Sequence, residues 1–249
     1  MSKTILITGA SSGLGEEMAR QFAGLGYDLA LCARRTERLS ALRAELADKH
    51  PGQRFEVREL DVVDDDQVFE VFRAFAEDFG TLDRVVVNAG IGKGAPLGTG
   101  RYDANRRTAM TNFVAVLAQA EAALEIFRAQ NAGHLVLISS VAAMRGLPKA
   151  TTTYAATKAA VAHLAEGLRA ELWHSPIKVS AIYPGYIRSE MNDTTSNPPF
   201  IVSTEKGVAS MVDAIEKEKA KAFAPAWPWV PLGAALRHLP LPIARKLMS

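Results

Sequence analysis

The sequence lacks the features that mark secreted, membrane-spanning or nucleic-acid-binding proteins. It has 249 residues and one cysteine, Cys32, which cannot form an internal disulfide, so we expect a cytoplasmic protein in a reducing compartment. Its net charge is only +2 and no long basic block occurs, which predicts no nucleic-acid partner. The longest strongly apolar run, residues 135–144, is too short to cross a bilayer. The first strand pattern starts at Thr4, so we expect no signal peptide.

Short apolar segments alternate along the chain with longer segments of helical periodicity. The predicted strands are residues 4–8, 28–33, 55–60, 82–87, 134–139, 178–183 and 220–224. The predicted helices are residues 13–26, 36–50, 64–79, 105–129, 152–173 and 203–219. Apolar strands that alternate with helices predict a parallel sheet covered on both faces. We therefore expect a single-domain α/β fold, a Rossmann-like doubly wound parallel sheet of about seven strands with helices on both faces.

A glycine-rich segment, residues 8–15 (TGASSGLG), joins the first predicted strand to the first predicted helix. Glycines at this place allow a tight turn, close approach of the backbone to a pyrophosphate, and close packing of helix on strand. The helix N-terminus also offers free N–H groups to an anion. We therefore predict a dinucleotide phosphate site formed by Gly9, Ser11, Ser12, Gly13, Leu14 and Gly15.

The same segment has an alternative interpretation. Residues 9–13 match the G-x-S-x-G elbow of serine hydrolases, in which Ser11 would be the nucleophile and His174 or His238 the base. That alternative leaves Gly15 unexplained, so we favour dinucleotide binding.

The second predicted strand ends in Cys32-Ala33-Arg34-Arg35, without a carboxylate. An acidic residue there would bind the ribose hydroxyls of NAD and repel a 2′-phosphate, whereas a guanidinium can bind the phosphate bidentately. We therefore predict NADP(H) as the cofactor, with Arg34 as the main contact and Arg35 assisting. The alternative is two solvated arginines that start a helix.

Polar residues also follow the third and fourth predicted strands. Asp61 and Val62 follow the third strand, and Asn88-Ala89-Gly90 follow the fourth. Ligands of open α/β sheets bind at these carboxyl ends, so we expect Asp61 to reach adenine and Asn88 to shape the loop beside the adenine ribose. A helix cap or a turn is the alternative for each.

Tyr154 and Lys158 are four residues apart in a predicted helix and therefore share a face. Carbonyl reduction needs a proton donor, and a neighbouring ammonium lowers the pKa of a phenol toward the working range of an acid/base. The preceding strand ends in Ser139-Ser140, and Ser140 is placed to donate a hydrogen bond to a substrate carbonyl. A strand-end serine and a surface Tyr–Lys pair are the structural alternatives.

Together these motifs resemble the short-chain dehydrogenase/reductase family over roughly residues 3–225. They occur in the family's order: TGASSGLG at 8–15, Asp61, NAG at 88–90, Asn112, Ser140, YAATK at 154–158 and PG at 184–185. The resemblance implies that Tyr154 is the acid/base, that Lys158 binds the nicotinamide ribose and lowers the tyrosine pKa, and that Ser140, rather than Ser139, polarises the carbonyl.

The resemblance implies further roles. Asn112 would hold a water in a proton relay with Lys158. The remaining cofactor contacts would be Pro184, Gly185, Ile187, whose backbone would bind the carboxamide, and Ser189, which replaces the usual Thr. Family members pair their two long helices, so we expect a homodimer or homotetramer formed through residues 105–129 and 152–173.

We assign residues 1–225 to the NADP-binding catalytic domain, within which residues 186–202 form a substrate lid. In the lid, Met191 and Phe200 indicate an apolar substrate face. Residues 226–249 form a tail rich in Trp, Pro and Leu. We expect the tail to pack over the substrate cleft or across an oligomer interface. Peripheral membrane contact is the less favoured alternative.

The sequence as a whole favours an NADP(H)-dependent oxidoreductase, a carbonyl reductase or the reverse alcohol dehydrogenase, acting on a small-molecule carbonyl or secondary alcohol. We expect no metal site. The alternatives are the serine hydrolase with Ser11 and a non-catalytic NADP-binding regulator. Neither alternative uses the set of Ser140, Tyr154 and Lys158.

Overall fold

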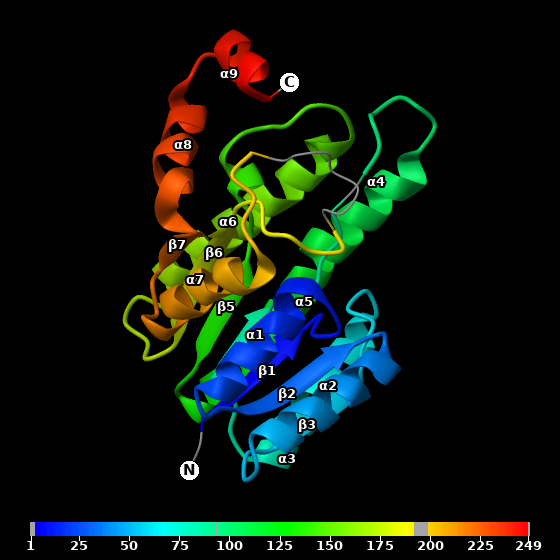
Figure 1. Ribbon diagram of the computed structural model, residues 1–249, viewed down its shortest axis with the longest axis vertical. Helices are drawn as coiled ribbons and strands as arrows, with labels where there is room; N and C mark the ends of the chain where they lie inside the picture. The colour runs from blue at the N-terminus through cyan, green and yellow to red at the C-terminus, as the bar shows by residue number, and fades with distance from the viewer. Residues whose placement is uncertain (1–2, 93, 192–198, 249) are drawn as a thin grey trace.

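The computed structural model describes residues 3–92, 94–191 and 199–248 (Figure 1). Its centre is a seven-stranded sheet in the order β3-β2-β1-β4-β5-β6-β7, and every neighbouring pair is parallel. The strands are β1 (Thr4–Thr8), β2 (Asp28–Ala33), β3 (Phe55–Glu59), β4 (Arg84–Val87), β5 (His134–Ile138), β6 (Lys178–Pro184) and β7 (Lys221–Ala224). The predicted doubly wound α/β fold is confirmed.

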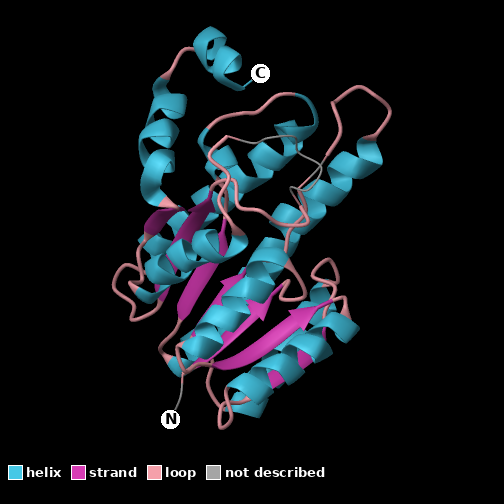
Figure 2. Cartoon of the chain, in the orientation of Figure 1, coloured by secondary structure: helices cyan, strands magenta, loops and turns pink. Residues whose placement is uncertain are grey.

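Helices cover both faces of the sheet (Figure 2). They are α1 (Gly13–Gly24), α2 (Thr36–Lys49), α3 (Asp65–Phe79), α4 (Tyr102–Ala109), α5 (Ala115–Gln130), α6 (Thr152–Glu171), α7 (Thr204–Glu216), α8 (Ala226–His238) and α9 (Leu241–Met248). Alternate residues of each strand enter opposite cores. Leu6 of β1 packs with α3, α5 and α6, whereas Ile5 and Ile7 pack with α1, α2 and α7.

The predicted long helix over residues 105–129 is wrong in detail. It begins earlier, at Tyr102, and a π-helical turn, η1 (Met110–Val114), separates α4 from α5. Over Tyr102–Gln130 the described chain has one helix long and apolar enough to cross a membrane, but half of its apolar window is buried, as in the core helix of a globular domain. Such π turns recur at functional sites, and this one contains Asn112.

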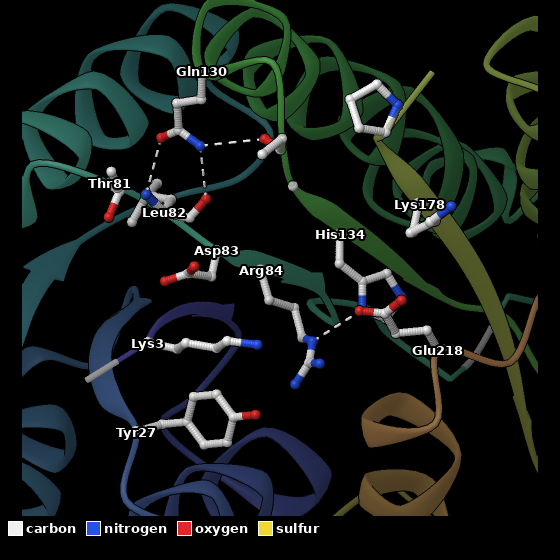
Figure 3. A pocket seen from close by; sticks show the side chains of 13 residues that line it. Lys3, Tyr27, Thr81, Leu82, Asp83, Arg84, Gln130, His134, Lys178 and Glu218 are labelled. Carbon is white, nitrogen blue, oxygen red and sulfur yellow. Dashed lines mark hydrogen bonds between the residues drawn. The ribbon is translucent and has the colours of Figure 1, made fainter. Parts of the chain in front are cut away.

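The amino edge of the sheet carries a buried network of polar side chains beside a cleft of about 310 Å³ (Figure 3). Arg84 is only 6% exposed, and its Nε donates to His134 Nδ1 at 3.0 Å. Since His134 Nδ1 accepts, its Nε2 carries the proton and donates to Ser180 Oγ at 2.7 Å. Arg84 Nη1 also contacts Glu216 Oε1 at 2.5 Å, and Tyr27 donates to the same carboxylate. Burial, together with the Arg84 charge, lowers the pKa of His134 to about 3, so the network holds a neutral imidazole.

The tail, for which no secondary structure was predicted, forms α8 and α9. Figure 1 shows both helices beyond the carboxyl edge of the sheet. Trp229 of α8 is buried, and its indole packs directly on Gly185, the residue that follows β6. Its ring lies 5.7 Å from Tyr186 and 6.1 Å from Phe200, centroid to centroid. Within the chain, α8 therefore covers both ends of the segment expected to act as a lid, as the favoured interpretation of the tail requires.

Candidate active site

Tyr154 and Lys158 occupy the first two turns of α6, at the carboxyl edge of the sheet. A short 3-10 turn, η3 (Lys149–Thr151), leads into this helix. Lys158 is 5% exposed, and its Nζ donates to the Ile138 carbonyl at the end of β5 at 2.9 Å. The same Nζ lies 6.0 Å from the centre of the Tyr154 ring. The predicted pair therefore shares one buried face of α6 and points toward the end of β5.

The two serines at the end of β5 have different partners. Ser139 Oγ is buried and donates to the Lys158 carbonyl at 2.8 Å, so it fastens α6 to the strand. Ser140 begins the 3-10 turn η2 (Val141–Met144), where its Oγ accepts from Ala142 N at 3.1 Å. Ser140 also lies beside the Tyr154 hydroxyl, where it acts to lower the pKa of the phenol. Of the two, Ser140 faces the phenol, and Ser139 supports the lysine.

Burial shifts both ionisable groups toward their neutral forms. It raises the pKa of Tyr154, and Ser140 opposes this only in part. It lowers the pKa of Lys158 to about 8. The expected lowering of the tyrosine pKa by Lys158 does not outweigh the effect of burial, and the ammonium is directed at the Ile138 carbonyl. The phenol is therefore a protonated donor beside a readily titrated amine.

Asn112 lies in the π turn η1 and is fully buried. Its side-chain amide pairs with the backbone of Ile91, accepting from N and donating to O, each at 2.8 Å. A β-carbon on Gly90 would lie 3.2 Å from Asn112 Oδ1 and 3.6 Å from Lys158 Nζ. Both side chains thus face Gly90, which places Asn112 beside Lys158. The relay water remains a prediction.

Asn105, which belongs to none of the sequence motifs, fixes the start of α6. Its Oδ1 accepts from Ala95 N at 3.0 Å and from Thr153 Oγ1 at 2.9 Å. Asn105 therefore holds the residue next to Tyr154. It is the first residue of the helix predicted over residues 105–129, so the sequence pattern did not distinguish it from an ordinary helix-start residue.

The glycine-rich loop has the backbone of a phosphate cradle. Gly9 and Gly13 adopt φ values of +67° and +56°, which favour glycine. A β-carbon on Gly15 would overlap the Gly9 carbonyl and Asn88 Nδ2, so helix and strand approach as closely as predicted. Ser12 begins α1 without a side-chain cap hydrogen bond, which leaves the helix N–H groups directed at an open edge.

Asn88 holds this loop in place. Its Nδ2 donates to the Thr8 carbonyl at 2.9 Å. In return Thr8 Oγ1, which the sequence analysis did not single out, accepts from Asn88 N at 3.0 Å and from Ala89 N at 3.1 Å. The ends of β1 and β4 are thereby joined under the loop, as the shaping role predicted for Asn88 requires.

After β3 the chain forms a turn. Asp61 Oδ1 accepts from Val63 N at 3.2 Å, while Asp64 caps α3 by accepting from Gln67 N. Val62 is buried in the core. Asp61 thus has the turn geometry weighed as its alternative, and an adenine contact remains a prediction.

The arginines after β2 differ from one another. Arg34 is exposed and makes no hydrogen bond or ion pair with any residue that the structure describes. Arg35 donates through Nε to Ser11 Oγ at 3.2 Å and also to Ser12 Oγ. Arg38, in the first turn of α2, was missed, although it follows Arg35 at helical spacing and shares its partner Glu190. Arg35 and Arg38 thus converge on one anionic group, and the role of Arg34 as the main phosphate contact stays a prediction.

The segment after β6 runs back over the glycine-rich loop. Pro184 ends the strand, and Gly185 N donates to Ala224 O at 3.0 Å. Ile187 is buried and forms an isolated bridge with Val202. A β-carbon on Gly13 would lie 3.4 Å from Ser189 Cβ. Pro198 and the rest of the central lid segment, residues 192–198, lie outside the described residues.

A family model described as "short chain dehydrogenase" matches residues 3–199. The chain belongs to this family. The fold, the order of the motifs and the convergence of Ser140, Tyr154 and Lys158 at one edge agree with that membership.

Relatives agree with the assignment to the short-chain dehydrogenases. An "Uncharacterized oxidoreductase" of Mycobacterium tuberculosis is 50% identical over 97% of this chain and 96% of its own. A short-chain dehydrogenase from Sphingobium yanoikuyae in complex with NADPH has a TM-score of 0.82 and 30% identity, over 94% of this chain and 93% of that one. A Burkholderia phymatum enzyme in complex with NAD has a TM-score of 0.84 and 23% identity, over 95% and 93%, and supports the fold alone.

The serine hydrolase alternative is not supported in this short-chain dehydrogenase. Ser11 Oγ accepts from Arg35, and within the described part of the chain no histidine hydrogen-bonds it. His174 follows the 20-residue helix α6, which runs about 30 Å from the carboxyl edge to the amino edge. The glycine-rich loop and His174 therefore lie at opposite edges of the sheet. Over the described residues, no cluster of three metal-ligating side chains occurs either.

Proposed function

We propose that this short-chain dehydrogenase transfers a hydride between NADP(H) and a carbonyl or secondary alcohol, with Tyr154 as acid/base. The observation that carries the proposal is the half-buried, protonated phenol, which lies beside Ser140 and one helical turn from Lys158. A proton donor held in this way suits the oxygen of a carbonyl that gains a hydride.

The chain's own residues perform the proton chemistry. Tyr154 Oη gives its proton to the substrate oxygen, and Ser140 Oγ donates a second hydrogen bond that stabilises charge on that oxygen. Lys158, with a pKa of about 8, would stabilise the resulting phenolate and return a proton to it. The uncapped N-terminus of α1 and the glycine-rich loop would hold the pyrophosphate. Bound NADP(H) supplies or accepts the hydride.

The choice of NADP(H) rests on this chain's arginines, since solved structures with similar folds include both NADPH and NAD complexes. Arg35 and Arg38 converge on one carboxylate beside Ser11 and Ser12, where the second strand ends. Two guanidinium groups at that place suit a 2′-phosphate. Arg34 is exposed next to them and is available as a further contact.

The substrate side is apolar where it is described. Met191 and Phe200 are exposed on the lid, and Trp229 packs behind Phe200. We propose a substrate with an apolar body next to the reacting carbon.

We also propose a homo-oligomer formed through α5 and α6, because Val114 and Leu117 expose apolar side chains just before and within α5. Light scattering of the wild type and of Leu117→Arg tests the oligomer.

A steady-state assay tests the proposed reaction. A panel of ketones and aldehydes is incubated with NADPH or NADH, and loss of nicotinamide absorbance is followed for the wild type and Tyr154→Phe. We expect NADPH-dependent turnover that falls at least 100-fold in the variant, with cofactor affinity retained. Turnover of Tyr154→Phe at the wild-type rate would refute the mechanism. A clear preference for NADH would refute the cofactor assignment, and cofactor binding without turnover of any panel member would favour the non-catalytic regulator.

A further inference from the structure

A carboxylate from the lid side of the molecule lies between two arginines of the cofactor side. Glu190 Oε2 is 3.1 Å from Arg35 Nη1, and Glu190 Oε1 is 2.6 Å from Arg38 Nη1. Glu190 is separated from these arginines by about 150 positions in the sequence, so only the fold brings the three groups together. Each carboxylate oxygen accepts from a different guanidinium, as two oxygens of a phosphate would.

Arg35 is held at the glycine-rich loop independently of Glu190. Arg35 is the residue before α2, and its Nε donates to Ser11 Oγ. This is the end of the second strand, where cofactor specificity is read in dinucleotide-binding folds. The Glu190 carboxylate therefore lies at the place where a 2′-phosphate would be received.

The backbone on either side of Glu190 is also held close to the cofactor site. Ser189 Cβ would contact a β-carbon on Gly13, and a β-carbon on Gly92 would lie 2.6 Å from Met191 Cγ. The base of the segment is fixed, because Arg188 N donates to Val202 O at 3.0 Å. The two arginine contacts are thus made by a segment that crosses the loop from Gly13 toward Gly92.

We infer that Glu190 competes with the 2′-phosphate of NADP(H) for Arg35 and Arg38, so that the carboxylate must leave both arginines before the phosphate can bind. The inference rests on the proposed NADP(H) dependence. A phosphate and a carboxylate cannot share the same two guanidinium groups, because their like charges repel at this distance. A phosphate has more charge and more acceptor oxygens than a carboxylate, so it binds the two guanidinium groups more tightly and displaces the carboxylate. A nucleotide without the 2′-phosphate leaves the carboxylate in place.

Glu190 therefore opposes NADP(H) binding while it keeps the lid segment against the glycine-rich loop. All three side chains are about half exposed, and exposed ion pairs are individually weak. We accordingly expect removal of the Glu190 charge to strengthen binding of a 2′-phosphate about 3- to 10-fold.

The experiment uses 2′,5′-ADP and 5′-AMP, which differ only in the 2′-phosphate, and measures their dissociation constants by calorimetry. The proteins are the wild type, Glu190→Gln, Arg38→Gln, the double variant, and Glu205→Gln as a matched control. Glu205 is an exposed acid at the start of α7 whose carboxylate contacts neither arginine. We expect Glu190→Gln to bind 2′,5′-ADP about 3- to 10-fold more tightly and 5′-AMP unchanged. We expect Glu205→Gln to match the wild type, and the gain from Glu190→Gln to shrink when Arg38 is already replaced.

The outcomes separate this inference from the proposed function. If the wild type prefers 2′,5′-ADP to 5′-AMP but Glu190→Gln leaves both constants unchanged or weakens the first, the competition by Glu190 is refuted and the NADP(H) assignment stands. If neither the wild type nor Glu190→Gln distinguishes the two nucleotides, the NADP(H) assignment itself is refuted. Equal tightening for 2′,5′-ADP and 5′-AMP would also overturn the inference, since the effect would then not involve the 2′-phosphate.

Discussion

Buried polar side chains at the two edges of the parallel sheet have different kinds of hydrogen-bond and ion-pair partners. At the amino edge, the Arg84 guanidinium and the His134 ring each have partners that match their charge and donor pattern. At the carboxyl edge, Lys158 is equally buried but has a neutral carbonyl as its hydrogen-bond partner, and Tyr154 is shifted away from ionisation. The amino edge pairs its cation with a carboxylate and its neutral imidazole with matching hydrogen-bond partners, whereas the carboxyl edge buries a lysine against a neutral carbonyl, an arrangement that suits acid/base chemistry.

The direction of the strands explains why the difference falls this way. Each helix that follows a strand begins at the carboxyl edge, so that edge collects helix N-termini and free N–H groups. The amino edge collects helix C-termini and short returns to the next strand. There a cation such as Arg84 can join strand β4 to Glu216 at the end of α7.

The largest expected contrast lies within the carboxyl edge, between two adjacent serines. Ser140→Ala should lower turnover about 100- to 1000-fold, because it removes a donor to the substrate oxygen. Ser139→Ala should leave turnover within a few-fold of the wild type and reduce stability by about 1 kcal/mol, because it removes a buried hydrogen bond to the Lys158 carbonyl. Steady-state kinetics and urea unfolding measure both effects. The reverse ranking of the two variants would show that Ser139 is the catalytic serine.

At the amino edge the expected loss is in stability. Arg84→Met should reduce the free energy of unfolding by about 3 kcal/mol, because Glu216 and His134 lose their buried partner. The matched control is Arg128→Met, which breaks the exposed pair with Glu171 and should change stability by less than about 1 kcal/mol. Urea unfolding measures both variants. Equal effects would mean that the amino edge network contributes no more than a surface ion pair.

The fold, and the positions of Tyr154, Lys158 and the glycine-rich loop within it, were predictable from the sequence because they depend on local patterns. The periodicity of strands and helices, the glycine-rich loop and the Tyr–Lys spacing can each be recognised within a short stretch of sequence. The hydrolase alternative could not be rejected from the sequence, since rejection required knowing that neither His174 nor His238 hydrogen-bonds Ser11 within the described residues.

The features that were missed depend on contacts between distant segments. The π turn at Asn112 accompanies its pairing with the Ile91 backbone, and helical periodicity does not encode that contact. In the sequence Glu190 is one polar residue of a predicted loop, and only the fold shows that it lies between Arg35 and Arg38. The rise in the Tyr154 pKa was likewise unpredictable, because burial depends on packing and the spacing to Lys158 indicates only a nearby charge.

The pH dependence of stability provides a smaller test of the amino edge. His134 has a pKa of about 3 in the folded protein, below the usual 6.5, so the unfolded state binds the proton more readily. The contribution of the neutral His134 ring to the free energy of unfolding is fully present above pH 6.5 and is lost as the pH falls toward 3. The loss between pH 6.5 and pH 5 is about 2 kcal/mol. His134→Gln keeps one donor and one acceptor but does not titrate, so its unfolding free energy should fall less steeply over this range. Parallel curves for the two proteins would place the acid sensitivity elsewhere.

The smallest expected effect is a gain rather than a loss of stability, and it concerns Lys158 at the carboxyl edge. Lys158→Met should abolish turnover yet raise the free energy of unfolding at pH 7 by about 1–2 kcal/mol, because a cation buried against a neutral carbonyl is replaced by an apolar side chain of similar length. The lowered pKa of Lys158 means that the wild type gains stability as the pH rises from about 8 toward 10.5. The difference between the two proteins should therefore shrink over that range, as urea unfolding at pH 7, 8 and 9.5 would measure. A Lys158→Met protein less stable than the wild type would mean that the carboxyl edge is as well satisfied as the amino edge, and the contrast between them would not hold.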